Sequence, residues 1–131
     1  MASTPQFAST PVAAGIATGT TASTTPFGTP SAPVTIYTAP TGGARIDEIG
    51  ITGLGTTSAN QIIIYVYNGT TYWPIDTILT TATTASATVA PFSYTFQQEN
   101  LMLPATYSLR AALFGADTSG YMITAFGGTF A

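Results

Sequence analysis

Apolar and polar residues alternate along most of the chain after residue 32, and clusters of Gly, Pro, Asn, Asp and Ser interrupt the alternation at short intervals. A period of two predicts β-strands, because successive side chains of a strand point to opposite faces. No stretch shows the 3.6-residue period of a helix. We expect seven strands, with an eighth left open, at about residues 34–38, 44–54, 61–67, 70–79, 89–96, 106–114 and 121–126.

This pattern predicts an all-β fold. Regularly spaced turns favour an antiparallel β-sandwich of jelly-roll type for residues 32–131, with an immunoglobulin-like sandwich or a barrel as alternatives. Residues 61–67 (QIIIYVY) are apolar on both faces, so this strand should be central and covered on both sides. The Asn-Gly pair at residues 68–69 predicts a hairpin. In the returning strand we expect Trp73, Ile75 and Leu79 to share one face.

One strand contains a phase slip. Ile49 and Ile51 share a face, but Ile46 is out of phase with them, which predicts a bulge near Asp47 and Glu48. A bulge could align these two carboxylates as a glycosidase-like acid pair. We expect instead that they pair locally with Arg45 or lie exposed at a sheet edge, where charges discourage aggregation.

The first 31 residues have a different composition from the rest. Residues 1–31 are rich in Ala, Ser, Thr, Gly and Pro, and four prolines interrupt them, at positions 5, 11, 26 and 30. Such a segment cannot bury enough apolar surface by itself to offset the entropy lost on ordering. It is either a disordered tail or an extended N-terminal arm held by a neighbouring subunit. We favour the arm, with Phe7, Ile16 and Phe27 as its anchors.

Composition excludes much chemistry. Of 131 residues 5% are charged, His and Cys are absent, and Arg45 and Arg110 are the only cations. Without His, Cys or Lys, the chain lacks the usual general base, thiolate nucleophile and Schiff-base amine. We therefore expect no enzymatic activity, no cofactor and no metal site. A net charge of −3 argues against nucleic-acid binding, and the absence of a long apolar run argues against a membrane span.

The few charges and aromatic rings yield the candidate site residues. Arg110 interrupts an apolar strand, so it should have a partner: Asp47, Glu48 or a second subunit. Tyr65, Tyr67 and Tyr72 gather around the predicted hairpin and are the best candidates for exposed contact residues, whereas most other rings should lie in the core. Residues 117–120 (DTSG) are expected to form a turn, with a weak ion site as the alternative.

Three segments resemble a known family. Residues 33–47 (PVTIYTAPTGGARID), 103–111 (LPATYSLRA) and 125–130 (AFGGTF) are similar, in that order, to small β-rich proteins of tailed bacteriophages and prophages. The family commonly has Gly where this chain has Thr106. The resemblance implies a virion-associated structural role and brings no catalytic residues.

Two functional hypotheses follow. The first is a capsid decoration or cement protein on the virion surface, which binds the major capsid protein and itself, as a homotrimer. Its neutral, Thr-rich surface would make contacts whose strength depends little on salt concentration, because they need no ion pairs. The second is a carbohydrate- or receptor-binding module of a tail fibre or baseplate, which would use Tyr65, Tyr67, Tyr72 and Trp73. Several of these rings lying coplanar in one open groove would favour the second hypothesis.

Overall fold

The computed structural model describes residues 10–130, apart from the side chains of residues 99 and 100. This part of the chain contains eight strands and no helix, which confirms the all-β prediction. The strands are β1 (Thr10–Ala17), β2 (Val34–Thr38), β3 (Ala44–Gly53), β4 (Asn60–Tyr67), β5 (Tyr72–Thr80), β6 (Ser93–Leu103), β7 (Ser108–Leu113) and β8 (Tyr121–Thr129).

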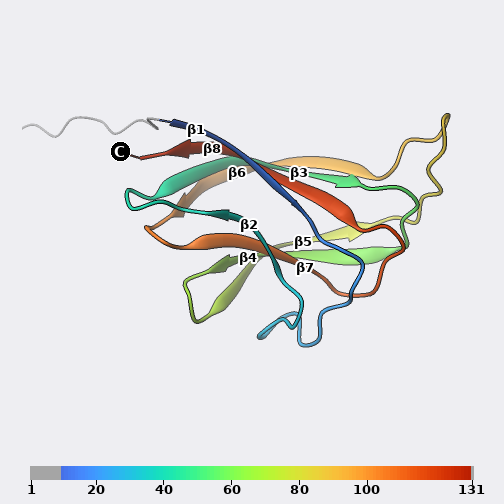
Figure 1. The fold of residues 1–131 in the computed structure, drawn as a ribbon, viewed down its shortest axis with the longest axis horizontal. Helices are drawn as coiled ribbons and strands as arrows, with labels where there is room; N and C mark the ends of the chain where they lie inside the picture. The colour runs from blue at the N-terminus through green and yellow to red at the C-terminus, as the bar shows by residue number, and fades with distance from the viewer. Residues whose placement is uncertain (1–9, 131) are drawn as a thin grey trace, which may run out of the picture.

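The strands form two packed antiparallel sheets (Figure 1). One sheet has the order β1-β8-β3-β6 and is called here the β1 sheet; the other has the order β2-β7-β4-β5 and is called the β2 sheet. Consecutive strands alternate between sheets except at the β4–β5 hairpin, and this order is that of a jelly roll. The predicted sandwich and its jelly-roll type are therefore confirmed.

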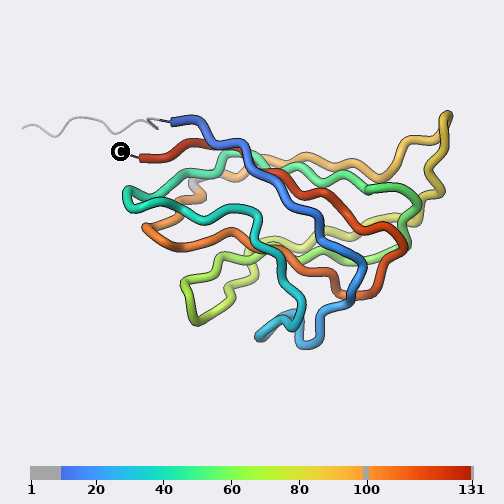
Figure 2. Tube along the Cα trace, viewed as in Figure 1, coloured from blue at the N-terminus to red at the C-terminus, as the bar shows by residue number. Residues whose placement is uncertain are grey.

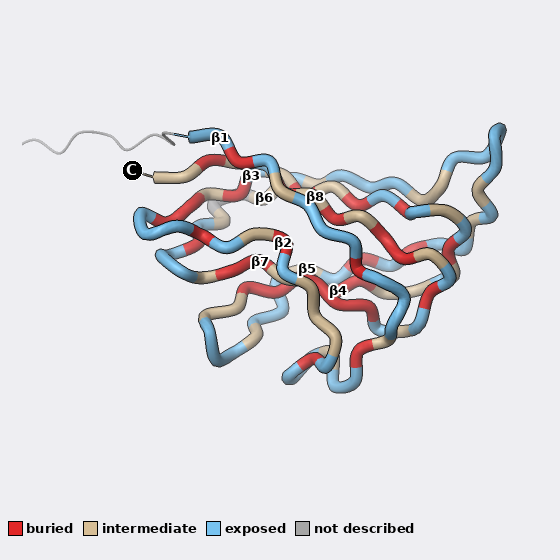
Figure 3. Tube along the Cα trace, viewed as in Figure 1, coloured by how far each residue is buried: buried red, intermediate tan, exposed pale blue. Residues whose placement is uncertain are grey.

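The core lies between the two sheets and follows the predicted alternation. Its largest fully buried side chains include those of Ile49, Ile62, Ile64 and Leu109, which come from three different strands. Figure 3 shows buried positions recurring along both sheets. Strand β4 lies between β7 and β5, and residues 62–66 are all buried, so the prediction of a central strand covered on both faces is confirmed.

The eighth strand comes from the segment that we expected to be an arm. Residues 10–17 are extended as predicted, but they form β1 and pair along their whole length with β8 of the same chain. An edge strand tolerates Pro11 and Gly15, and Val12 is buried. Within the described residues, the boundary at residue 31 therefore does not separate an arm from a domain. Phe7 lies outside the described residues.

The pairing of the described strands shifts at three places, and two of these bulges set which candidate side chains face outward. The predicted bulge near Asp47 is confirmed, because the pairing of β3 shifts between Ile46 and Glu48 with both neighbouring strands. A second bulge in β5 places Pro74 opposite Tyr65 and Asp76 opposite Ile64, so Ile75 is the extra residue.

Because of the bulge in β5, the prediction that Trp73, Ile75 and Leu79 share a face is wrong. Trp73 pairs with the core residue Val66, whereas Leu79 points outward and is 77% exposed.

The turns follow simple stereochemical rules. The predicted hairpin is present, with four loop residues between the paired Tyr67 and Tyr72. The Asn68 side chain accepts hydrogen bonds from the N–H groups of Thr70 and Thr71, at 2.9 and 2.7 Å. In the β6–β7 turn, the N–H of Tyr107 donates to the carbonyl of Pro104, and Thr106 has φ +69°. A type II turn favours Gly at this third position, because the residue there has a positive φ.

Candidate functional site

The outer face of the β2 sheet holds most of the candidate residues. Ile63, Tyr65 and Tyr67 point outward from β4 because Ile62, Ile64 and Val66 point into the core. The neighbouring strand β7 contributes Ser108, Arg110 and Ala112 to the same face. Ile63, Tyr65 and Ala112 form a second apolar cluster and are fully buried, although they lie outside the sandwich. This burial requires a cover.

Part of the cover is the segment between β1 and β2, residues 18–33, whose loop is traced in Figure 2. The hydroxyl of Tyr65 donates a hydrogen bond to the carbonyl of Pro26. The N–H of Ser23 donates to the carbonyl of Leu113 at 2.9 Å. The Pro-rich segment therefore packs on the β2 sheet of its own chain, and its prolines do not interrupt a strand ladder.

Tyrosine rings from the β4–β5 hairpin stack beside this cover. Tyr67 and Tyr72, which are paired across the hairpin, have ring centroids 4.2 Å apart and an interplanar angle of 26°. Tyr65 meets Tyr72 edge-on, with centroids 5.5 Å apart at 80°. Burial, together with the charge of Tyr72, raises the pKa of Tyr65 to about 12. The three predicted tyrosines thus form one cluster, but Tyr65 is fully buried beneath the covering segment, so the prediction that it is an exposed contact residue is wrong.

Arg110 completes this cluster. It pairs with Tyr65 across β7 and β4, and its guanidinium carbon lies 4.1 Å from the ring centroid of Tyr67. Its Nε donates to Ser108 Oγ and its Nη1 donates to Tyr72 Oη, both at 3.0 Å. We call Tyr65, Tyr67, Tyr72, Ser108 and Arg110 the tyrosine–arginine cluster.

The prediction that Asp47 or Glu48 pairs with Arg110 is wrong. On the β1 sheet, Asp47 forms an ion pair with Arg45, with 2.8 Å between Asp47 Oδ1 and Arg45 Nε. Glu48 lies on the same sheet. Strands β3 and β7 belong to different sheets, so side chains on the outer faces point in opposite directions. Among the described residues, no carboxylate forms an ion pair with Arg110.

An exposed apolar group lies at the other end of the same sheet face. Phe27 from the covering segment contacts Phe114, just after β7, with ring centroids 6.2 Å apart. Phe27 is 53% exposed and Phe114 is 49% exposed. Leu79 lies nearby, because Phe114 and Leu79 both neighbour Gln61 of β4. We call Phe27, Phe114 and Leu79 the phenylalanine patch.

Most of the predicted contact residues therefore converge on one surface. The structure brings Tyr65, Tyr67, Tyr72 and Arg110 together and places Phe27 on the same face. Ile16 does not join them, since it lies on β1, opposite Ile123, and is 37% exposed. The sequence interpretation missed Phe114, Leu79 and Ser108. The sequence pattern placed all three residues in predicted strands. The bulge in β5, which puts Leu79 on the outer face, has no clear signal in the sequence.

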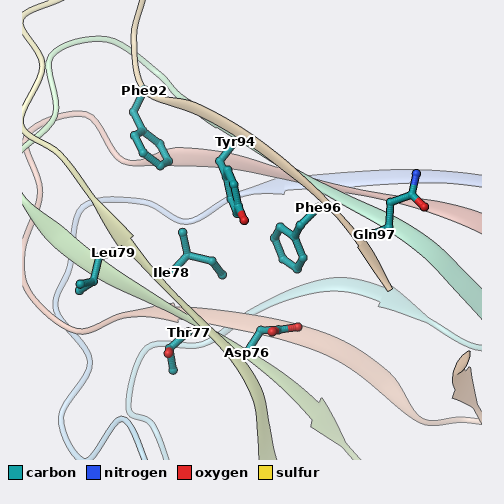
Figure 4. A pocket seen from close by; sticks show the side chains of 8 residues that line it. All are labelled: Asp76, Thr77, Ile78, Leu79, Phe92, Tyr94, Phe96 and Gln97. Atoms are coloured by element: carbon teal, nitrogen blue, oxygen red, sulfur yellow. The ribbon is translucent and has the colours of Figure 1, made fainter. Parts of the chain in front are cut away.

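A groove of about 510 Å³ opens at the side of the sandwich where β5 and β6 are the edge strands (Figure 4). Figure 4 shows the rings of Phe92, Tyr94 and Phe96 pointing towards Ile78 of β5. The Gln98 side chain donates to Asp76 from the opposite wall. The walls of the groove combine these aromatic rings with the polar side chains of Asp76, Thr77 and Gln97, so the groove is not apolar throughout.

Intramolecular contacts engage several other charges. Arg45 and Asp47 pair with each other, and Asp76 accepts from Gln98. Asp117 accepts hydrogen bonds at 3.2 Å from the N–H groups of Ser58, Ser119 and Gly120. Burial acts to raise the pKa of Asp117, but these bonds outweigh it and lower the pKa below its usual value. The turn predicted at residues 117–120 is therefore an Asp-anchored turn.

Within residues 10–130, leaving aside the side chains at 99 and 100, no group of three Asp, Glu, His or Cys residues is arranged to hold a metal ion. In the same part of the chain, no helix has the length and apolar character needed to cross a membrane.

Comparison with protein-family models, with curated proteins and with solved structures gave no match for this chain.

Proposed function

We propose that this chain is a structural virion protein of a tailed phage, which decorates the head shell and binds the major capsid protein through the outer face of its β2 sheet. The observation that carries the proposal is the phenylalanine patch, which lies on the same face as the tyrosine–arginine cluster. Exposed aromatic and aliphatic side chains, with few free charges around them, are typical of surfaces that meet other proteins.

The expected energetics suit a cementing role. Full burial of a Phe or Leu side chain contributes about 1.5–3 kcal/mol, so covering the half-exposed members of the patch would contribute about 1 kcal/mol each. Such contacts are modest singly but add up when one molecule bridges several shell subunits. They involve few ion pairs, so attachment should depend little on salt. Self-association as a homotrimer would supply the several binding faces.

The second candidate, a carbohydrate- or receptor-binding module of a tail fibre or baseplate, has weaker support. It needs several rings that lie coplanar and open to solvent. Tyr65 is buried, Tyr67 and Tyr72 stack on each other, and Trp73 pairs with a core position and contacts Tyr107. No single face therefore presents all four rings to a sugar.

The test uses particles of the phage that encodes the chain. Quantitative mass spectrometry of purified particles should find the protein in a copy number matched to the capsid lattice, and labelling should place it on the head. A location only on the tail would contradict the proposal. Sedimentation of the purified protein tests the homotrimer.

A double variant tests the face itself. Phe27→Ser with Phe114→Ser should abolish binding to particles that lack the protein, while the sandwich remains folded. Phe126→Ser is the matched control, since Phe126 is 43% exposed on the outer face of the β1 sheet. Equal loss of binding in both would contradict the assignment of the β2 sheet as the binding face.

A further inference from the structure

Arg110 has N–H donors that no described residue accepts. A guanidinium has five N–H groups. One, on Nε, goes to Ser108 and one, on Nη1, goes to Tyr72. The remaining Nη1 donor and both donors on Nη2 have no hydrogen-bond partner among the described residues. Each terminal nitrogen therefore keeps at least one N–H without a partner among the described residues, and we call these two donors, one on each nitrogen, the end-on fork of Arg110.

The surroundings hold this fork in place. Ser108 accepts from Nε, Tyr72 accepts from one Nη1 donor, and the guanidinium carbon lies over the Tyr67 ring. An arginine held in this way has already lost much of its side-chain freedom, so a ligand would not need to order it. The fork matches the two oxygens of one carboxylate.

The charge balance also indicates an external partner. Arg110 is half-buried against aromatic rings, where a cation is more poorly solvated than in open water. The carboxylates that the structure describes are engaged elsewhere, except Glu48, which lies on the other sheet. Among the described residues of a chain with net charge −3, this positioned cation therefore has no opposite charge on the candidate binding face.

We propose that Arg110 is a carboxylate-binding residue, and that its end-on fork takes one Asp or Glu side chain of the shell protein. The inference rests on the proposed function for the identity of the partner. It explains how a largely apolar contact is oriented, because a bidentate pair fixes direction whereas apolar burial does not. A single cation does not provide the several phosphate contacts that nucleic-acid binding requires.

A solution experiment tests the carboxylate site without any shell protein. The probe is N-acetyl-glutamate amide, and the readout is the NMR signal of the Arg110 Nε–H together with the ring signals of Tyr67 and Tyr72. We expect saturable shifts in the wild-type protein, absent in Arg110→Met and at least tenfold weaker in Arg110→Lys, which keeps the charge without the fork. Arg45→Met is the matched control and should bind the probe like the wild type.

Several outcomes would overturn the inference. One is the absence of saturable shifts in the wild type; another is equal binding by Arg110→Lys. Saturation by N-acetylneuraminic acid but not by the glutamate probe would assign the fork to an acidic sugar instead. If Arg110→Met does not fold, Tyr67→Leu retains the guanidinium and removes its stacking partner, and it should weaken probe binding several-fold; unchanged binding would count against a preorganised fork.

Particle binding separates this inference from the proposed function. If the function is correct and Arg110 acts as proposed, Arg110→Met should bind particles at least tenfold more weakly than the wild type. Full binding by Arg110→Met, combined with loss in the Phe27 and Phe114 double variant, would overturn the inference and leave the function standing. Absence of wild-type binding would contradict the function, while the probe experiment would still report on the site.

Discussion

The guanidinium of Arg110 lies over the ring of Tyr67, with 4.1 Å between its carbon and the ring centroid. The contact joins β7 to the far end of β4, diagonally across the sheet, because Tyr65 is the direct neighbour of Arg110. A cation–π contact of this kind contributes about 0.5–2 kcal/mol, depending on how well water is excluded. It therefore both anchors the hairpin and positions the guanidinium of Arg110 on this face.

Replacing Tyr72 by Phe should weaken this anchor. Tyr72→Phe keeps the ring stacked on Tyr67 but removes the acceptor of the Arg110 Nη1 bond. Loss of one hydrogen bond to a charged group should lower the free energy of unfolding by about 1–2 kcal/mol. Urea denaturation measures the change, with Tyr94→Phe, at an exposed ring, as the control. Equal stability of the two variants would contradict the role given to Tyr72.

Replacing Tyr65 by Phe should loosen the covering segment. The variant removes the hydroxyl that donates to the Pro26 carbonyl, so we expect about 1 kcal/mol less stability at pH 7 and faster hydrogen exchange at Ser23. Tyr67→Phe is the control. Unchanged exchange at Ser23 would show that the Tyr65 hydroxyl does not hold the segment.

The same variant carries a pH prediction. Tyr65 has a pKa of about 12 in the folded protein and about 10 when unfolded, so the protonated group favours the folded state. This contribution is complete below about pH 10 and is lost as the pH rises through 12. Tyr65→Phe has no hydroxyl to ionise and does not lose this contribution. The difference in free energy of unfolding between wild type and variant should therefore narrow between about pH 10 and pH 12. A constant gap in alkaline denaturation curves would contradict the assigned pKa.

Much of the fold follows from local pattern. The alternation of residues in β4, the Asn-Gly hairpin and the phase slip at Ile46 each have a direct physical cause in side-chain period or turn chemistry. Strand β1 was missed as a sandwich strand because small residues and Pro11 suppress the usual strand signal. Its alternating Val12, Ala14 and Ile16 carry that signal weakly, and the partner β8 is more than 100 residues away.

The site was harder to predict than the fold. Tyr65, Tyr67 and Tyr72 are close in sequence, so their clustering could be anticipated from the hairpin. The contact with Arg110 depends on β7 pairing with β4, a long-range neighbour relation that no local pattern specifies. A carboxylate partner was the natural expectation for a half-buried arginine, but aromatic rings and hydroxyls engage it instead.

Replacing Thr106 by Gly should stabilise the protein. Thr106 has φ +69°, a left-handed conformation that costs an L-residue about 1–2 kcal/mol. Glycine removes this strain but adds unfolded-state entropy worth about 0.5–1 kcal/mol, so we expect a net gain of up to about 1 kcal/mol. Thr106→Ala retains the strain and is the control. A glycine variant less stable than the alanine variant in thermal denaturation would contradict the expectation.

Two deletions from the N-terminus should distinguish the contribution of β1 to stability from that of residues 2–9. Removing residues 2–9 leaves every described strand pair in place, so the melting temperature should remain close to that of the full chain. Removing residues 2–17 deletes β1, uncovers β8 as an edge strand and removes the buried Val12. We expect this longer deletion to aggregate or to lose cooperative unfolding. An unchanged melting temperature for it would restore the interpretation of residues 10–17 as an independent arm.

Replacing Asp117 by Asn tests how the last turn is held together. The folded protein lowers the pKa of this carboxyl, so its contribution is present above the usual value of 3.8 and is lost as the pH falls through the lower folded value. Asp117→Asn should reduce stability at pH 7 by about 1–3 kcal/mol, since three N–H groups lose a charged acceptor. The difference in free energy of unfolding between wild type and variant should shrink below about pH 4.

Asp47→Asn, at an exposed ion pair, is the matched control and should change stability by less than about 1 kcal/mol. A deficit that persists unchanged at pH 2 would show that Asp117 acts through its shape and not through its charge.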